Sequence, residues 1–107
     1  MDVAQYQIVL VNLNPTQGGE IRKTRPCLVI SPNEINRHLR TVIVAPMTTT
    51  VKDYPTRVSI KHRNKNGSVA IDQIRTIDKG RIIKTMGRIT QVEIERCKAV
   101  LKETFVD

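Results

Sequence analysis

Short β-branched runs, each ended by turn-forming residues after a few positions, most constrain what this chain can fold into. The first run, residues 7–13, ends at Asn14-Pro15, and the second, residues 26–30, ends at Ser31-Pro32. Valine and isoleucine favour strands, whereas proline and asparagine favour the turns between them. We therefore predict strands at residues 7–13, 26–30, 41–45 and 82–89.

Residues 57–71 predict a β-hairpin. Apolar and polar residues alternate over residues 57–61, which is the pattern of a strand with one face in water. An Asn-Gly turn follows within residues 64–67, and the apolar residues 68–71 supply the returning strand. About five to seven short strands are expected in all.

The C-terminal residues predict a helix that packs on this sheet. Thr90 and Glu93 have the spacing of a capping box, in which each side chain bonds the other residue's backbone N–H. A shorter helical segment is expected at residues 33–39. We therefore predict a mostly β fold, a small antiparallel barrel with a C-terminal α-helix. The residues expected on the buried face of that helix are Ile94, Cys97, Leu101 and Phe105.

Length and composition agree with one soluble domain. The 107 residues suffice for a single modest core, so we expect one domain over residues 1–107. No apolar run approaches the roughly 20 residues that cross a bilayer, and no signal peptide opens the chain, so we expect a cytoplasmic protein without a membrane partner.

Cys27 and Cys97 lie in apolar patterns without metal-binding spacing, and both are expected to be reduced packing residues.

The net charge of +8, from 18 Lys and Arg against 10 Asp and Glu, indicates a polyanionic partner. Such an excess attracts either nucleic-acid phosphates or an acidic protein. Aromatic residues make up only 3% of the chain, so a sheet of exposed rings that stacks RNA bases is not expected.

Arg25 is the first candidate functional residue. It stands between a glycine-containing loop and a strand that starts at Pro26, where its guanidinium stays accessible and can bind a phosphate with several donors. The alternative interpretation is an ion pair with Glu20.

Two clusters are further candidates. The hydroxyls of residues 48–50 follow the third run and can present donors to an anion, although threonines after a proline are also common turn residues. The basic residues Lys61, Arg63 and Lys65 crowd the expected hairpin tip, where they either follow a phosphate backbone or form a solvated turn.

Histidines and carboxylates give weaker signals. His38 and His62 are candidates for acid and base in RNA cleavage, but both have cationic neighbours that suit them to the surface. Asp72 and Gln73 follow an apolar run, and a carboxylate there is more often a hydrogen-bonding or turn residue. The chain contains no GxGxxG, Walker, HExxH or GxSxG pattern, so we expect neither a cofactor nor a metal site.

Four segments, "VNLNPTQGGE", "TRPCLVISPNEIN", "VIVAPMTT" and "VAIDQIRTID", together resemble the MazF/PemK family of toxin ribonucleases. The resemblance extends from about Ile8 to the final helix, with the motifs in the family's order. It implies an SH3-like, CcdB-like barrel that forms a homodimer and is inhibited by an acidic MazE-like antitoxin. It also implies metal-independent cleavage of single-stranded RNA to 2′,3′-cyclic phosphate and 5′-hydroxyl ends.

Carried over by position, the family's essential arginine falls on Arg25 and its essential threonine on Thr48. These two side chains can stabilise the charged phosphorane formed when a ribose 2′-hydroxyl attacks the phosphate. Arginine is a poor general base, so no base is assigned. The residues expected to bind the substrate are Gly18, Gly19, Glu20, Lys23, Thr49, Lys61, Arg63, Asp72 and Gln73.

The sequence departs from the family at a few positions. Gly19 replaces the usual serine of the loop at residues 16–24, which matches the family's mobile gate, and Leu10 replaces an aromatic residue. Two alternatives to the ribonuclease remain. One is a CcdB-like inhibitor of DNA gyrase that cleaves nothing, and the other is a barrel that binds RNA without cutting it.

Overall fold

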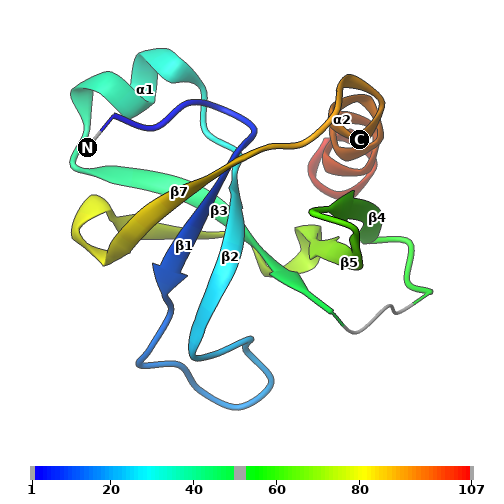
Figure 1. Ribbon diagram of the computed structural model, residues 1–107, viewed down its shortest axis with the longest axis horizontal. Helices are drawn as coiled ribbons and strands as arrows, with labels where there is room; N and C mark the ends of the chain where they lie inside the picture. Colours follow the sequence, from blue (N-terminus) through cyan, green and yellow to red (C-terminus); the bar gives the residue numbers. More distant parts are fainter. Residues whose placement is uncertain (1, 50–52, 107) are drawn as a thin grey trace.

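The computed structural model describes residues 2–49 and 53–106 (Figure 1). Within these ranges the chain forms a seven-stranded sheet, two α-helices and two short 3-10 helices. In chain order the elements are β1 (Gln7–Asn12), β2 (Thr24–Val29), α1 (Asn33–His38), β3 (Thr41–Thr48), β4 (Arg57–His62), β5 (Lys65–Ala70), η1 (Ile71–Gln73), β6 (Arg75–Asp78), η2 (Lys79–Arg81), β7 (Ile82–Arg88) and α2 (Gln91–Phe105).

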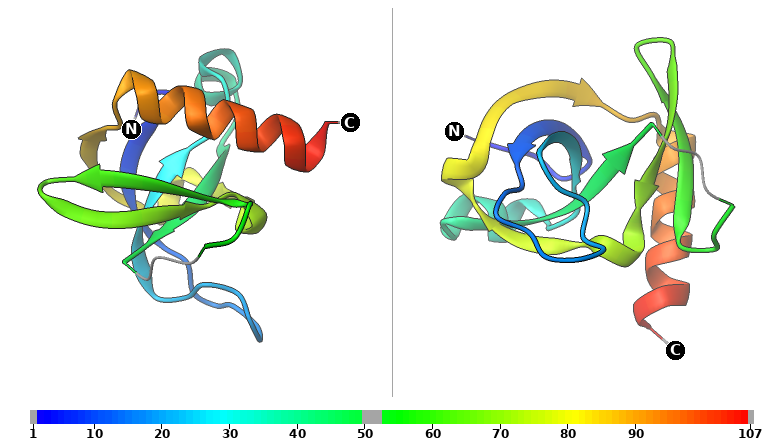
Figure 2. Two further views of the ribbon diagram at one scale, coloured as in Figure 1. Left: turned by 90° about the vertical axis from the view of Figure 1, so that its right-hand side faces the viewer. Right: turned by 90° about the horizontal axis from the view of Figure 1, so that it is seen from below.

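The strands form one curled antiparallel sheet. Its order is β4-β5-β3-β2-β1-β7, and β6 pairs separately with the first part of β3. Figure 2 shows β7 arching around the molecule and α2 lying along the β4–β5 hairpin. The predicted fold class, a mostly β small antiparallel barrel with a C-terminal helix, is thus confirmed, and the sheet curls into a half-barrel.

β3 is longer than predicted because it changes neighbours along its length. Residues 41–44 pair with β6, whereas Met47 and Thr48 pair with β5. Pro46 lies between these two pairings, so its missing N–H falls where the sheet already changes partner. The prediction that this strand ends at Ala45 was therefore wrong, and the extension carries Thr48 to the strand's end.

Alternate residues of the central strands pack into two apolar clusters. In β1, Ile8 packs in a cluster that includes Ile94 and Cys97 of α2, whereas Val9 and Val11 pack in a cluster among β1, β2, β3, β6 and β7. Burial on both faces stabilises β1, β2 and β3, and their ends provide fixed positions for a functional site.

A capping box begins α2, as predicted, and its glutamate also bonds to β4. Thr90 Oγ1 accepts from the Glu93 N–H at 3.2 Å, and Glu93 Oε1 accepts from the Thr90 N–H at 2.9 Å. Glu93 Oε2 accepts from the Lys61 N–H at 2.8 Å. Ile94 and Cys97 are buried, but the predicted burial of Phe105 is wrong, since it is 54% exposed where α2 extends past the hairpin (Figure 2).

The predicted hairpin forms, but its turn was placed wrongly. The two turn residues are Arg63 and Asn64, with φ of 51° and 62°, and His62 faces Lys65 as the last pair of the ladder. Gly67, expected in the turn, lies within β5, where an added Cβ would be 2.9 Å from the Thr48 carbonyl oxygen. Because glycine has no side chain, β3 and β5 can approach closely at this position.

β6 was not predicted, because only Ile77 of its residues is buried and the polar residues around it give no strand pattern. Cys27 and Cys97 are free and buried, as expected of packing residues. In the described part of the chain, no helix is long and apolar enough to span a membrane.

Candidate functional site

The pairing of β2 with β3 brings Arg25 and Thr48 to the same end of the sheet. The last paired residues are Cys27 and Pro46, and Arg25 and Thr48 each lie two residues beyond this pair. At Thr48, β3 pairs with Ser68 of β5. Because side chains alternate along a strand, Arg25 and Thr48 share the face on which Cys27 and Pro46 lie.

Arg25 retains donors for an anion. It is half-buried, and its Nε donates to the Arg22 carbonyl at 3.1 Å. Within the described residues it forms no ion pair, and the expected alternative partner, Glu20, instead accepts the Gln17 N–H at 2.6 Å. The guanidinium has five N–H donors, so most of them remain for a ligand.

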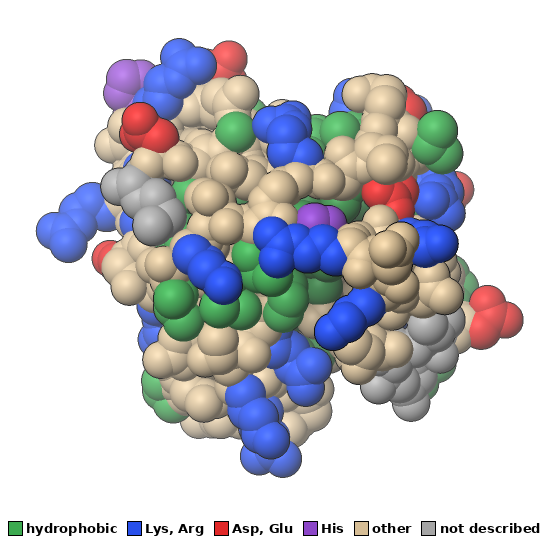
Figure 3. Space-filling view, in the orientation of Figure 1, with side chains coloured by type: hydrophobic (Ala, Val, Ile, Leu, Met, Phe, Trp, Pro, Cys, Tyr) green, Lys and Arg blue, Asp and Glu red, His purple; other side chains and the backbone are tan. Residues whose placement is uncertain are grey.

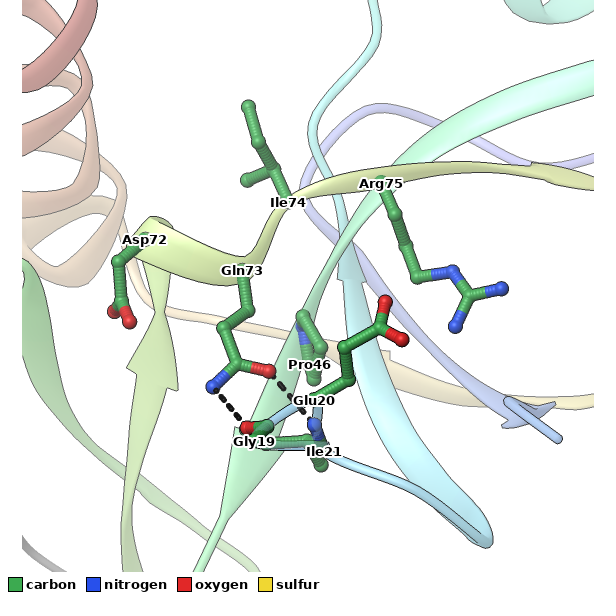
Figure 4. Close-up of a pocket in the computed structure, with 8 residues that line it drawn as sticks. All are labelled: Gly19, Glu20, Ile21, Pro46, Asp72, Gln73, Ile74 and Arg75. Atoms are coloured by element: carbon green, nitrogen blue, oxygen red, sulfur yellow. Dashed lines mark hydrogen bonds between the residues drawn. The ribbon is translucent and has the colours of Figure 1, made fainter. Parts of the chain in front are cut away.

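The amide of Gln73 fastens the β1–β2 loop to η1 (Figure 4). Its Oε1 accepts from the Ile21 N–H at 2.7 Å, and its Nε2 donates to the Gly19 carbonyl at 3.4 Å. Gly18 adopts a positive φ of 55° in the adjacent turn, and an added Cβ on Gly19 would meet nothing within 4 Å. The position of Gly19 therefore has room for a small side chain.

The fastened loop forms one wall of a cleft of about 450 Å³. Gly19 to Ile21 line one side, Pro46 lies at the sheet, and residues 72–75 line the other side. Since Pro46 shares its strand face with Thr48, the cleft adjoins the pair formed by Arg25 and Thr48.

Asp72 is held by an arginine that sequence reasoning missed. Arg57 Nε and Nη2 donate to the two carboxylate oxygens at 2.8 and 3.3 Å, and Thr56 Oγ1 donates to Oδ1 at 3.0 Å. Partial burial works to raise the pKa of Asp72, but the hydrogen bonds from Arg57 and Thr56 outweigh it, so the pKa lies below its ordinary value. The carboxylate is therefore ionised and engaged at neutral pH.

Arg57 also lies over the Tyr54 ring, with its guanidinium carbon 5.5 Å from the ring centroid. This cation–π contact and the two bonds to Asp72 hold the arginine beside the cleft. From the sequence, Arg57 could be described only as a polar residue of an alternating strand. Its role was missed because its partner, Asp72, lies 15 positions away.

The other predicted substrate-binding residues lie in three different places. Thr49 is exposed directly after β3, and Thr50 falls outside the described residues. Lys23 ends the β1–β2 loop with a positive φ of 73°. Lys61 and Arg63 lie on the hairpin, where Lys61 faces outward beside α2 and Arg63 Nη2 donates to the Met86 carbonyl at 3.5 Å. Figure 3 shows Lys and Arg side chains spread over the face of the molecule that is seen in Figure 1.

The sequence profile of the family described as "PemK-like, MazF-like toxin of type II toxin-antitoxin system" matches residues 4–105. The chain belongs to this toxin family. The match spans every strand and helix described above, so the PemK/MazF resemblance noted in the sequence is confirmed.

Solved structures share the fold of this PemK/MazF toxin. MazF from Deinococcus radiodurans is 24% identical, with a TM-score of 0.86 over 97% of this chain and 96% of that one. An endoribonuclease in complex with its cognate antitoxin, from a mycobacterial species, is 24% identical, with a TM-score of 0.81 over 94% and 92% of the two chains. The Mycobacterium tuberculosis toxin MazF-mt6 is 24% identical, with a TM-score of 0.76 over 92% and 95%.

Proposed function

We propose that this toxin is an endoribonuclease that cuts single-stranded RNA, messenger RNA included, at short sequences and so inhibits translation and growth. The observation that carries the proposal is the antiparallel β2–β3 pairing, which brings Arg25 and Thr48, each two residues beyond the last pair of Cys27 and Pro46, to the same end of the sheet. Arg25 has no acidic partner among the described residues, which leaves its charge for a phosphate. The description of fold relatives as endoribonucleases supports the same activity.

The proposed reaction needs stabilisation of charge more than covalent help. The ribose 2′-oxygen attacks the adjacent phosphorus, its proton leaves, and the bond to the 5′-oxygen breaks as that oxygen takes a proton. The products are a 2′,3′-cyclic phosphate and a 5′-hydroxyl. Arg25 stabilises the charge on the phosphorane oxygens, and the Thr48 hydroxyl donates to one of them. The guanidinium supplies positive charge itself, so the proposed reaction is independent of metal ions.

The proposed partner is an acidic antitoxin. The toxin's net charge of +8 suits an acidic chain that lies along the cleft and blocks access to Arg25. Fold relatives have been solved with an antitoxin, including MazE–MazF from Deinococcus radiodurans. We further propose that the toxin acts as a homodimer in the cytoplasm, where messenger RNA is found.

The test is RNA cleavage in EDTA by the purified toxin, with the cut ends mapped on a mixed-sequence single-stranded RNA. Discrete cuts with cyclic phosphate ends are expected. Arg25→Ala should lower the rate by about 10²- to 10³-fold, the usual cost of removing one oxyanion donor. Arg25→Lys keeps the charge but loses the planar fork, and Thr48→Val keeps the shape but loses the hydroxyl, so both should also cut slowly.

Arg40→Ala is the matched control. Arg40 is exposed and directly precedes the first residue of β3, whereas Thr48 is the last residue of that strand. The variant therefore loses one positive charge far from the site. It should cut at close to the wild-type rate. Intact RNA after incubation with folded wild-type toxin would overturn the proposal, and inhibition of DNA gyrase would then be measured.

A further inference from the structure

A second pocket, of about 260 Å³, lies on the other face of the β2–β3 end. It is enclosed by the β4–β5 hairpin and β7, and its largely apolar walls include Pro26, Met47 and Met86. Because side chains alternate along a strand, Pro26 and Met47 point to the face opposite that of Arg25. Thr48 also lines this pocket, so it adjoins the proposed active site.

His62 contributes a buried polar atom without a partner. Val58, Ile60 and His62 point to the inner side of β4, and the first two are 3% and 5% exposed. The Nε2 of His62 is buried and has no hydrogen-bond partner within residues 2–49 and 53–106. Buried polar groups in proteins are nearly always hydrogen-bonded, so this nitrogen, in a residue that lines the pocket, is a candidate for a bond to a ligand.

The backbone of β7 fixes the position of this imidazole. Gly87 has a positive φ of 106°, and an added Cβ there would lie 3.3 Å from His62 Cε1. The ring therefore packs directly against the glycine, and His62 is among the residues that line the pocket.

Cationic side chains stand at the mouth of the pocket. Arg63 and Lys65 both line it, and Arg63 reaches across from the hairpin turn to the Met86 carbonyl. No acidic residue is among the residues that line it in the described part of the chain. The pocket thus combines apolar walls, one unpartnered ring nitrogen and a positive rim.

We propose that this pocket binds one nucleobase of the RNA strand, with His62 Nε2 hydrogen-bonded to the edge of the base. The inference rests on the proposed function, because it assigns a base site to the same substrate. Splayed bases of single-stranded RNA are recognised by flat apolar contacts and by bonds to their edges. A volume of about 260 Å³ lies just below the roughly 300 Å³ of the smallest drug-sized sites, which suits a single ring system.

The competing occupant is an apolar side chain of an antitoxin or of a second protomer. Such a side chain would contact the apolar walls of the pocket but would leave the His62 nitrogen without a hydrogen-bond partner. A nucleotide satisfies all three features, since its ring covers the walls, its edge bonds the nitrogen and its phosphate meets the cations. The observations therefore favour the base.

The direct test is NMR of the intact toxin with short 2′-O-methyl homo-oligonucleotides of A, C, G and U, which cannot be cleaved. The His62 ring and the methyl groups of Met47 and Met86 should shift with at least one base. A 2′-O-methyl abasic oligomer of the same length should shift only the rim. Equal shifts with the abasic oligomer, or no shift at these three residues, would overturn the base pocket and leave it to a protein side chain.

Cleavage by His62→Phe tests the hydrogen bond separately from the ring, because phenylalanine keeps the apolar contacts. We expect discrimination among the four bases at one position near the cut to fall about tenfold, as for the loss of a hydrogen bond to a base edge. His38→Phe changes the other, exposed histidine on α1 and should leave the preference unchanged. Unaltered preference in His62→Phe would contradict the inference, whereas a wild type that cuts no RNA would contradict the proposed function instead.

Discussion

At the scale of single residues, one amide determines where the β1–β2 loop lies. Gln73 accepts from the Ile21 N–H and donates to the Gly19 carbonyl, so its two ends hold backbone groups of opposite polarity. The amide carries its donor and its acceptor on separate atoms of one planar group, so it can bond both backbone groups at once. Gln73 was predicted to bind substrate, and its two bonds to the loop are a structural role that the sequence did not indicate.

Gln73→Leu should release the loop, because both bonds are lost while the side chain keeps its bulk. A typical hydrogen bond contributes about 1 kcal/mol, so exchange of the Ile21 amide proton should accelerate about fivefold to tenfold. Gln73→Glu keeps the acceptor for Ile21 and should retain most of the protection. Hydrogen exchange followed by NMR measures both, and equal protection in Gln73→Leu and the wild type would show that the amide does not hold the loop.

A second residue-scale prediction concerns Gly67, which has no room for a side chain. An added Cβ would lie 2.9 Å from the Thr48 carbonyl oxygen, so Gly67→Ala must push β3 and β5 apart. We expect a loss of about 1–3 kcal/mol in the free energy of unfolding, as for overpacked sites. Gly19→Ala is the control, since its Cβ meets nothing within 4 Å. Similar urea midpoints for the two variants would contradict this account.

At the scale of elements, the joint between α2 and β4 depends on one buried carboxylate. Glu93 is 5% exposed, and its two oxygens accept from the backbone N–H groups of Thr90 and Lys61. The sequence predicted the bond between Glu93 and Thr90, which belongs to the capping box. The bond to Lys61 closes a separation of 32 residues and depends on how the helix lies on the hairpin.

Glu93→Ala should loosen the helix from the hairpin. The change leaves two backbone donors without their acceptor, and hydrogen bonds to charged groups are each worth about 1.5–3 kcal/mol, so we expect a loss of about 3 kcal/mol in the free energy of unfolding. Glu93→Gln keeps one carbonyl acceptor and should lose less. Denaturant unfolding measures the difference, and an unchanged midpoint in Glu93→Ala would refute the proposed joint.

The same carboxylate makes stability depend on pH. Burial alone works to raise the pKa of Glu93, but hydrogen bonds from Thr90 and Lys61 outweigh it and place the pKa below the ordinary 4.5. A carboxyl with a lowered native pKa stabilises the fold above its unfolded value and loses that contribution as the pH falls through the native value. Wild-type stability should therefore fall below about pH 4.5, and less steeply in Glu93→Gln. Parallel pH profiles in urea would contradict this assignment.

At the scale of the whole molecule, two apolar clusters share the central strands and enclose the two thiols separately. Cys27 lies in the cluster among β1, β2, β3, β6 and β7, and Cys97 lies in the cluster beneath α2. Burial raises the pKa of Cys27 to about 12 and that of Cys97 to about 11. The thiolate is the reactive form, so both residues should be inert in the native state.

Labelling with a thiol-specific reagent at pH 8 tests this arrangement. We expect both cysteines of the native toxin to react at least about a hundredfold more slowly than in denaturant, where burial no longer raises their pKa. Cys27→Ser and Cys97→Ser would separate the two rates. Rapid labelling of native Cys97 would show that α2 does not cover its cluster as described.

The sequence by itself determined the β-rich class, the terminal helix with its capping box and the family, because these signals lie in short segments. The family resemblance singled out Arg25 and Thr48 as candidate active-site residues, but it did not provide their arrangement. The tertiary structure alone decided that the β2–β3 pairing brings them to the same end of the sheet, that Arg57 holds Asp72 and that Gln73 holds the loop.

The physical reason is the range of the interactions. A strand or a cap depends on residues a few positions apart, which a sequence window contains. The position of Gly67, the length of β3 and the burial of the His62 nitrogen depend on which strands become neighbours. That choice is made by the packing of the whole sheet, since backbone pairing and the two apolar clusters must be satisfied together.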